Sequence, residues 1–298
     1  MNEPRPASSS PDSAPPTHRV VRSDATYPAE LEDLRENAPS MLWTRGALDA
    51  LRVQPRVAIV GTRRATAYGE RVTREIATAF ARAGACVVSG LAVGIDGTAH
   101  RATLEAGGTT IAVLGTGIDR IFPKANRHLQ LAIAERGLLI SELEPDQHGW
   151  KSTFLQRNRI IAALASLTIV VEAPVTSGAL NTADHALGLG RSLAAVPGPI
   201  DQPQSVGTNG LIHAGAHIIT CAEDALSLVN LTPPPRVPRV DPKGDLGRVW
   251  AALADGALDI DRLCHRSGLP AAQCLAAVTQ LEIAGSIECA LSGEIRRR

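Results

Sequence analysis

The sequence predicts an α/β protein: a mostly parallel sheet with helices on both faces, followed by a small C-terminal domain. From Val57 onward, short apolar runs alternate with segments whose apolar residues recur every three or four positions. The apolar runs are largely continuous, as buried parallel strands require. A proline-rich stretch, residues 231–244, separates this region from the remainder. Repeated strand–helix units favour a doubly wound, Rossmann-like sheet.

Composition restricts the class of protein. The chain has 298 residues, 44% of them hydrophobic and 20% charged, with a formal net charge of zero. An anion-binding surface must therefore be local. The five cysteines form no C-x-x-C pair and are odd in number, which predicts reduced, mostly buried thiols in the cytoplasm. No apolar leader or membrane-length run is present, so we expect a soluble protein that is not secreted by a standard signal.

The N-terminal residues predict a tail and then a lead-in to the sheet. Residues 1–18 are rich in Pro, Ser and Ala and predict a disordered tail. The main domain is placed at residues 19–230, where segments 21–34 and 39–46 predict a short helix and a strand.

Strands and helices then alternate. The strands are predicted at residues 57–61, 86–90, 110–115, 138–143, 167–173, 192–197 and 217–220. The helices are predicted at residues 72–83, 95–105, 125–136, 157–165, 179–189 and 222–229. Gly84 is expected to end the first helix.

The loop after the first of these strands predicts an anion site. Gly61 is followed by Thr62, Arg63 and Arg64, and then by a helical pattern. The N–H groups of a first helical turn and the helix dipole favour negative charge, and arginine suits phosphate geometry. We therefore expect this loop to bind a phosphate.

The other strand-end loops carry basic and aromatic side chains. In a parallel sheet these loops share the edge where ligands bind. The basic residues are Arg63, Arg64, Arg120, Lys124, Lys151, Arg157 and Arg159. The aromatic residues are Tyr68, Phe122, Trp150 and Phe154. Cations interleaved with rings suit a single strand of nucleic acid, whose phosphates pair with Arg or Lys and whose bases stack.

Structural alternatives stand beside this interpretation. Arg157 and Arg159 begin a helix that continues with apolar residues, so one of them is alternatively a structural clamp. Phe122 and Phe154 alternatively cover the end of the sheet.

Two pairs of polar residues suggest other chemistry. Asp96 and His100 are four positions apart on one helix face, which suits a metal pair, a base with its orienter, or a structural hydrogen bond that fixes the loop. Glu142 and Glu172 end strands and suit either acid–base work or hydrogen bonds to loop amides and arginines. The phosphate loop of ATPases is absent and the dinucleotide fingerprint is incomplete, so we expect no cofactor and no metal.

The C-terminal residues 245–298 predict a winged-helix domain. Helices at residues 246–253, 259–266 and 271–284 precede a two-stranded ribbon with a turn at Ser292–Gly293. The third helix would carry the base-reading side chains, but it contains no Lys or Arg. Docking to a protein is therefore at least as well supported as reading of duplex DNA.

The strand-end loops resemble the DNA-processing protein A (DprA/Smf) family. The matching motifs include Gly61-Thr-Arg-Arg64, Ser89-Gly-Leu-Ala-Val-Gly-Ile-Asp-Gly-Thr-Ala-His100, Arg157-Asn-Arg159, Ser177-Gly-Ala-Leu-Asn181 and Gly207-Thr-Asn-Gly-Leu-Ile212. The match runs in order from about residue 21 to 229. Two features depart from the family: the N-terminal helical domain of many members is missing, and Leu155 stands where proline commonly follows the phenylalanine.

The resemblance implies an extended Rossmann-like domain that binds single-stranded DNA and does not act as an enzyme. It also implies a homodimer through that domain, and loading of the RecA recombinase onto incoming DNA in natural transformation. The expected nucleic-acid contacts are Thr62, Arg63, Arg64, Tyr68, Gly90, Gly94, Lys124, Phe154, Arg157, Asn158, Arg159, Ser177 and Gly178.

A nucleotide-processing enzyme, similar to the Rossmann-like phosphoribohydrolases, is the alternative. Those enzymes carry a Pro-Gly-Gly-x-Gly-Thr-x-x-Glu motif. The comparable place here, residues 176–185, breaks the glycine run and has His185 where the glutamate would follow.

Overall fold

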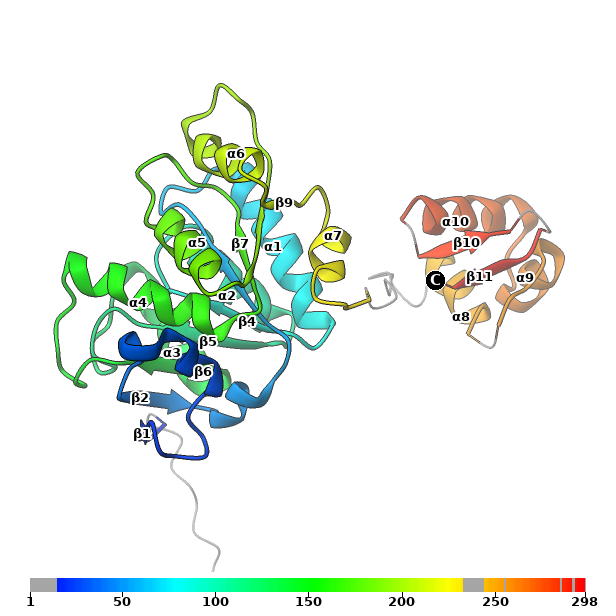
Figure 1. The fold of residues 1–298 in the computed structure, drawn as a ribbon. Helices are drawn as coiled ribbons and strands as arrows, with labels where there is room; N and C mark the ends of the chain where they lie inside the picture. The colour runs from blue at the N-terminus through cyan, green and yellow to red at the C-terminus, as the bar shows by residue number, and fades with distance from the viewer. Residues whose placement is uncertain (1–14, 233–243, 255, 285, 291–292, 298) are drawn as a thin grey trace, which may run out of the picture. The chain divides into compact units, whose positions relative to one another are not determined.

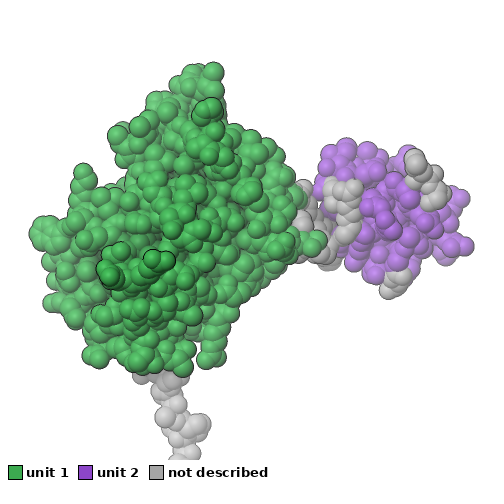
Figure 2. All heavy atoms as spheres, viewed as in Figure 1, with its two compact units in different colours: residues 1–232 green, residues 233–298 purple. Residues whose placement is uncertain are grey.

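A nine-stranded sheet in the order β1-β2-β6-β5-β4-β3-β7-β8-β9 organises the first part of the chain (Figure 1). The structure is a computed structural model that describes residues 15–232, 244–254, 256–284, 286–290 and 293–297. The chain divides into two compact units, residues 1–232 and 233–298 (Figure 2). The division falls inside the stretch 231–244 that the sequence suggested as a linker, and residues 233–243 of it lie outside the described part.

Seven strands of the sheet are parallel and short, and all except the edge strand His217–Ile218 are largely buried. They are β3 (Arg56–Val60), β4 (Cys86–Ser89), β5 (Thr109–Val113), β6 (Leu138–Ser141), β7 (Leu167–Val170), β8 (Ser192–Ala195) and β9 (His217–Ile218). Each strand overlaps its predicted range. The predicted strands ran further because apolar residues continue into the loops that follow.

The chain reverses direction across the sheet at β3. It runs outward from β3 through β4 and β5 to β6, and then returns to place β7 on the other side of β3. Val57 pairs with Val87 of β4 and with Leu167 of β7. Such a topological switch point opens a crevice at the carboxyl ends of the strands.

Two antiparallel strands extend the sheet beyond β6. They are β1 (Thr17–Val21) and β2 (Met41–Gly46), and β2 pairs with both β1 and β6. The sequence predicted β2 but not β1, which includes Thr17 and His18, two residues assigned to the tail. Residues 1–14 lie outside the described part of the chain.

Helices cover both faces of the sheet (Figure 1). The α-helices are α1 (Ala67–Arg82), α2 (Ile95–Glu105), α3 (Arg127–Arg136), α4 (Lys151–Leu164), α5 (Gly178–Gly188), α6 (Val206–His213) and α7 (Ala222–Ser227). The 3-10 segments are η1 (Ala29–Asn37), η2 (Leu48–Arg52), η3 (Lys124–Asn126) and η4 (Pro203–Ser205). Ile59 of β3 packs with Phe80 of α1, whereas its neighbour Val60 belongs to the core that α4 and α5 cover.

Several helical segments differ from expectation. Helix α1 begins at Ala67, five residues before its predicted range, and the short helix expected within residues 21–34 is the 3-10 segment η1, Ala29–Asn37. Helices α4 and α6 differ as well. Helix α4 begins at Lys151, six residues before the predicted start, because the Thr153 hydroxyl accepts a hydrogen bond from the Trp150 amide (2.9 Å) and so opens the first turn. Helix α6 was not predicted, since Gly207 and Gly210 lower its helix propensity. A side chain at Gly207 would lie 2.5 Å from the Ala173 carbonyl oxygen, so close packing accounts for that glycine.

The second unit has its own small core. Its elements are α8 (Asp245–Ala252), α9 (Ile260–Ser267), α10 (Ala271–Ile283), β10 (Ile287–Cys289) and β11 (Ile295–Arg297). The two strands pair antiparallel, and Leu263, Val278 and Leu281 are buried between the helices. Of the predicted turn, Gly293 has the left-handed φ of 84° that favours glycine, and Ser292 lies outside the described residues.

Candidate nucleic-acid interface

The loop after β3 places one side chain inward and two side chains outward. The Thr62 amide donates to the Glu172 carbonyl oxygen (2.7 Å), and its hydroxyl accepts from the Arg64 amide (3.2 Å). Thr62 is therefore buried, while Arg63 and Arg64 are exposed. No ion pair to either arginine occurs within the described residues.

The N-terminus of α1 already holds an internal anion. The buried carboxylate of Glu172 accepts hydrogen bonds from the Thr66 amide (2.9 Å) and the Thr66 hydroxyl (2.5 Å). Gly69 makes room for it, because a Cβ there would lie 2.2 Å from a Glu172 oxygen. A phosphate at this loop must therefore rely on the arginine side chains rather than on the first turn of α1. The same contacts give Glu172 the structural role that the sequence left open.

The glycines of the second loop are explained by internal packing. A Cβ at Gly90 would lie 2.5 Å from the Arg157 guanidinium. Gly94 has a φ of 81°, and a Cβ there would lie 2.4 Å from the Thr62 carbonyl oxygen. These positions bring the protein's own loops together, and Gly90 also lines a small pocket at the strand ends.

Arg157 is a buried clamp between two strand ends. It is 5% exposed, and its guanidinium donates to the Gly90 carbonyl (2.8 Å) and to the Val113 carbonyl. Burial lowers the pKa of Arg157 to about 10, against the opposing effect of nearby Asp96. Burial also raises the pKa of Asp96, whose carboxylate accepts from the Gly90 amide (3.2 Å).

Asp96 and His100 have separate partners. His100 Nδ1 lies 2.7 Å from the Thr110 hydroxyl, which itself donates to the Val87 carbonyl (2.8 Å). That hydroxyl has one proton, so Nδ1–H is the donor. Burial lowers the pKa of His100 to about 3, so it stays neutral. No group of three potential metal ligands occurs within the described residues.

Arg159 faces the N-terminal segment. Its guanidinium donates to both Glu142 carboxylate oxygens (2.8 and 2.6 Å) and to the Asn37 carbonyl (2.9 Å). Glu142 thus has an arginine partner, the structural alternative the sequence left open. Such a bidentate pair occupies the donors that a phosphate would need.

The start of α5 is organised by short polar side chains. The Ser177 hydroxyl accepts from the Ala179 amide (3.2 Å). The Asn158 side chain donates to the Gly178 carbonyl (3.1 Å) and to Asn181 Oδ1 (3.2 Å). Asn158 therefore joins α4 to α5.

A groove of about 800 Å³ lies between these elements at the switch point, and we call it the strand-end groove. Of the predicted residues, those lining it are Thr62, Arg63, Arg64, Phe154, Arg157, Asn158, Ser177 and Gly178. Lys151, Asn181 and Thr182 also line it, although they were not among the predicted contacts. The signals for two of them were that Lys151 is one of the basic residues of the strand-end loops and that Asn181 belongs to the motif Ser177-Gly-Ala-Leu-Asn181. Asp96 is the one acidic side chain among its lining residues, so the groove is cationic.

A smaller pocket of about 60 Å³ adjoins the groove and shares Arg63, Phe154 and Arg157 with it. Its other lining residues are Gly90, Ala92, Val93, Leu114, Gly115, Phe122 and Pro123. The Phe122 and Phe154 rings lie 5.0 Å apart, and the Arg63 guanidinium lies 5.8 Å from the centre of Phe154.

The remaining predicted residues line neither cavity. They are Tyr68, Gly94, Lys124 and Arg159. Lys124 is exposed in η3, directly after the pocket residue Pro123. The Tyr68 hydroxyl donates to the Pro197 carbonyl (2.9 Å), and the Arg71 guanidinium lies 5.5 Å from its ring.

The second unit presents few free cations in its described part. Arg296 pairs with Glu288, and Arg262 lies 3.5 Å from Asp259. The Arg297 guanidinium lies 4.3 Å from the centre of the Trp250 ring. The exposed face of α10 carries Leu275 and Ile283. Docking of this unit to a protein rather than to duplex DNA stays a prediction.

The fold and the site together define a class: a doubly wound α/β protein with a cationic groove at its switch point and a winged-helix appendage. The family model described as DNA recombination-mediator protein A matches residues 18–230, and the DprA winged helix domain matches residues 233–290. The chain therefore belongs to the DprA/Smf family, and the predicted family and fold class are confirmed.

Several named relatives cover most of the chain. A putative DNA processing protein DprA of Mycobacterium tuberculosis is 42% identical over 85% of this chain and 67% of its own length. Protein Smf of Escherichia coli is 35% identical over 95% of this chain and 78% of its own length.

Two solved structures show the same fold. DNA processing protein A from Streptococcus pneumoniae matches with a TM-score of 0.68 and 40% identity, over 70% of this chain and 73% of that one. DNA processing protein A from Helicobacter pylori, described as having a unique single-stranded DNA binding mode, matches with a TM-score of 0.65 and 31% identity. The match covers 71% of this chain and 94% of that one.

No helix in the described part of the chain has the length and apolar character needed to cross a membrane.

Proposed function

We propose that the chain binds single-stranded DNA in the strand-end groove. The observation that carries this proposal is the position of Arg63, Arg64 and Lys151, three exposed cations on one groove at the switch point. No ion pair to any of the three occurs within the described residues. Phosphates neutralise such cations, and the rings beside them accept bases without sequence preference.

The predicted contact residues then divide into two groups. Thr62, Arg63, Arg64, Phe154, Ser177 and Gly178 touch the strand, and Lys124 lies on its path beyond the pocket. The supporting residues Tyr68, Gly90, Gly94, Arg157, Asn158 and Arg159 hold these loops in place.

We further propose that the protein acts in the cytoplasm without catalysing a reaction. It protects incoming single strands and loads RecA on them during natural transformation and recombination. The membership of the chain in the DprA/Smf family supports this role. A homodimer formed through residues 19–230 would hold a longer strand with higher avidity.

Salt dependence tests the binding site. The affinity for a labelled oligo(dT) should fall with salt by about 0.7 log unit per log unit of salt for each phosphate neutralised. The Arg63→Ala and Arg64→Ala variants should each weaken binding and reduce this slope by about 0.7. Arg136→Ala is the matched control, because Arg136 is exposed at the end of α3, before β6 and away from the groove.

Two results would contradict the proposal. One is an Arg63→Ala/Arg64→Ala double variant that binds as tightly as the wild type. The other is equal affinity for single-stranded and duplex DNA in the full chain.

A further inference from the structure

Trp150 is a large exposed ring beside the strand-end groove. Its side chain is 68% exposed, against 45% for Phe122. It directly precedes Lys151, which lines the groove. Tryptophan is enriched at interfaces, because its ring offers a large apolar face together with a polar N–H.

The other rings at this edge are already engaged. Phe122 and Phe154 contact each other, and Arg63 lies over Phe154. Tyr68 lies against Arg71 and donates its hydroxyl to a backbone carbonyl. Within the described residues, the Trp150 ring takes part in none of the ring or cation–ring contacts.

The backbone that carries Trp150 is fixed. Its amide donates to the Thr153 hydroxyl (2.9 Å), which donates in turn to the Gly115 carbonyl (2.7 Å) after β5. A Cβ at Gly149 would lie 2.6 Å from the same carbonyl, so this loop packs closely on the sheet end. A ring on such a backbone loses little further freedom when a ligand covers it.

We propose that Trp150 stacks on a base of single-stranded DNA just outside the strand-end groove, next to the nucleotide whose phosphate Lys151 holds. This inference rests on the proposed function and extends the bound strand past the N-terminus of α4. Every base has a face to stack, so the contact selects single strands over duplexes without reading sequence.

Fluorescence and affinity of the full chain test this proposal. Titration with oligo(dT) should quench tryptophan emission, and Trp150→Phe should remove most of that quenching while retaining binding. Trp150→Ala should weaken binding by about 5- to 150-fold, the range for one stacked base. Trp250→Phe is the matched control, because Trp250 lies in α8 of the second unit, and it should leave both readouts unchanged.

An oligonucleotide of abasic residues separates stacking from charge. It keeps the phosphates, so Trp150→Ala should bind it as well as the wild type does. The inference is overturned if Trp150→Ala binds oligo(dT) as tightly as the wild type does. It is also overturned if the variant loses as much affinity for abasic DNA as for oligo(dT). If Arg63→Ala still weakens binding in that case, the groove stands without the stack. If neither variant changes binding, the proposed site itself is wrong.

Discussion

At the scale of single residues, burial decides what an arginine does in this protein. Arg157 donates to the carbonyls of Gly90 and Val113 and so joins the ends of β4 and β5. Arg63, in the loop after β3, extends into solvent with its guanidinium over the Phe154 ring. Only the Arg63 guanidinium can neutralise a phosphate at once, because the Arg157 guanidinium would first have to give up its hydrogen bonds to backbone carbonyls.

The Arg157→Lys and Arg63→Ala variants should therefore differ in kind. We expect Arg157→Lys to lower the free energy of unfolding by about 2 kcal/mol, because a single ammonium replaces a planar donor group between two buried carbonyls. Its salt slope for DNA binding should stay at the wild-type value. Arg63→Ala should lower the slope by about 0.7 and leave stability within about 0.5 kcal/mol of the wild type.

Urea unfolding and salt-resolved binding measure the two effects. A normal stability together with a reduced slope in Arg157→Lys would show that Arg157 contacts phosphate directly.

The sequence held a partial signal for this difference. Arg157 lies three, four and seven positions before Ile160, Ile161 and Leu164, which places it on their apolar helix face. Arg159 is off that face, but nothing in the sequence paired it with Glu142 or Asn37. The bond to Asn37 joins η1 to α4 across 122 positions of the sequence, whereas Glu142 lies 17 positions before Arg159.

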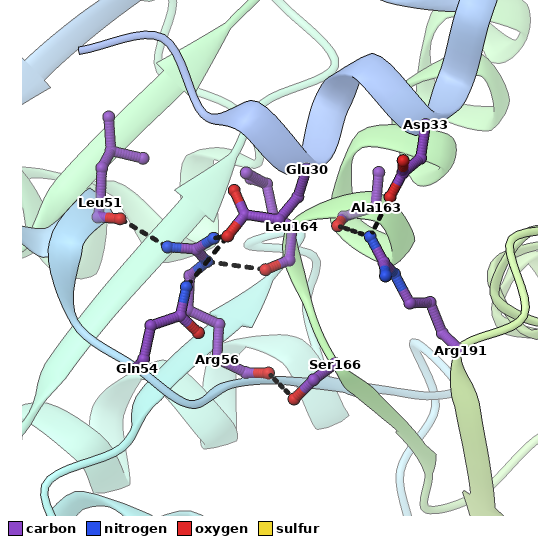
Figure 3. Close-up of polar contacts among 9 residues, drawn as sticks. All are labelled: Glu30, Asp33, Leu51, Gln54, Arg56, Ala163, Leu164, Ser166 and Arg191. Atoms are coloured by element: carbon purple, nitrogen blue, oxygen red, sulfur yellow. Dashed lines mark hydrogen bonds and ion pairs between the residues drawn. The ribbon is translucent and has the colours of Figure 1, made fainter. Parts of the chain in front are cut away.

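At the scale of elements, α4 is held at both ends. Its last carbonyls, those of Ala163 and Leu164, accept hydrogen bonds from Arg191 (3.5 Å) and Arg56 (2.7 Å) (Figure 3). Cations at a helix C-terminus satisfy free carbonyls and oppose the dipole. Asp33 and Glu30 of η1 pair with the same two arginines. The N-terminal segment is thereby tied to the helix that forms one wall of the groove.

Removal of Glu30 should expose the cost of this arrangement. Arg56 is 1% exposed, so Glu30→Ala leaves a buried guanidinium without its carboxylate partner. We expect a loss of about 2 kcal/mol in the free energy of unfolding, since Glu30 itself is partly solvated.

Glu32→Ala is the matched control for that measurement. Glu32 also lies in η1 but pairs with Arg22 on the surface, where both side chains are nearly half exposed. Its loss should leave the urea midpoint close to that of the wild type, because surface ion pairs contribute little to stability. Equal midpoints for the two variants in urea would contradict the role given to Arg56.

At the scale of the whole molecule, the strand–helix alternation predicted the sheet because each buried parallel strand is a continuous apolar run. It did not predict β1, a short edge strand with mixed polarity whose register depends on β2. Eight of the thirteen expected contacts line the strand-end groove, since parallel strands bring their ends to one edge. The strand-end loops did not show that Glu172 fills the N-terminus of α1, because that contact joins residues 106 positions apart.

The free edge of the sheet leads to the last prediction. Strand β9 pairs on one side only within the described residues, and Ile218 in it is 50% exposed. Exposed edges with apolar side chains favour pairing with another chain. We expect the wild type to have twice the chain mass of 31.3 kDa in light scattering, and Ile218→Glu to be a monomer.

The same variant distinguishes the avidity that the dimer adds from the affinity of a single strand-end groove. Ile218→Glu should keep wild-type affinity for an oligonucleotide that spans one groove, and lose about 10²-fold on one that spans two. RecA loading, measured as ATP hydrolysis on strands covered by single-strand-binding protein, should fall with the long-strand affinity. Leu131→Glu, an exposed site on α3 away from the groove and from β9, is the matched control and should leave mass and binding unchanged. A wild type of single-chain mass at working concentration would rule out the dimer, because avidity then has no second groove to act through.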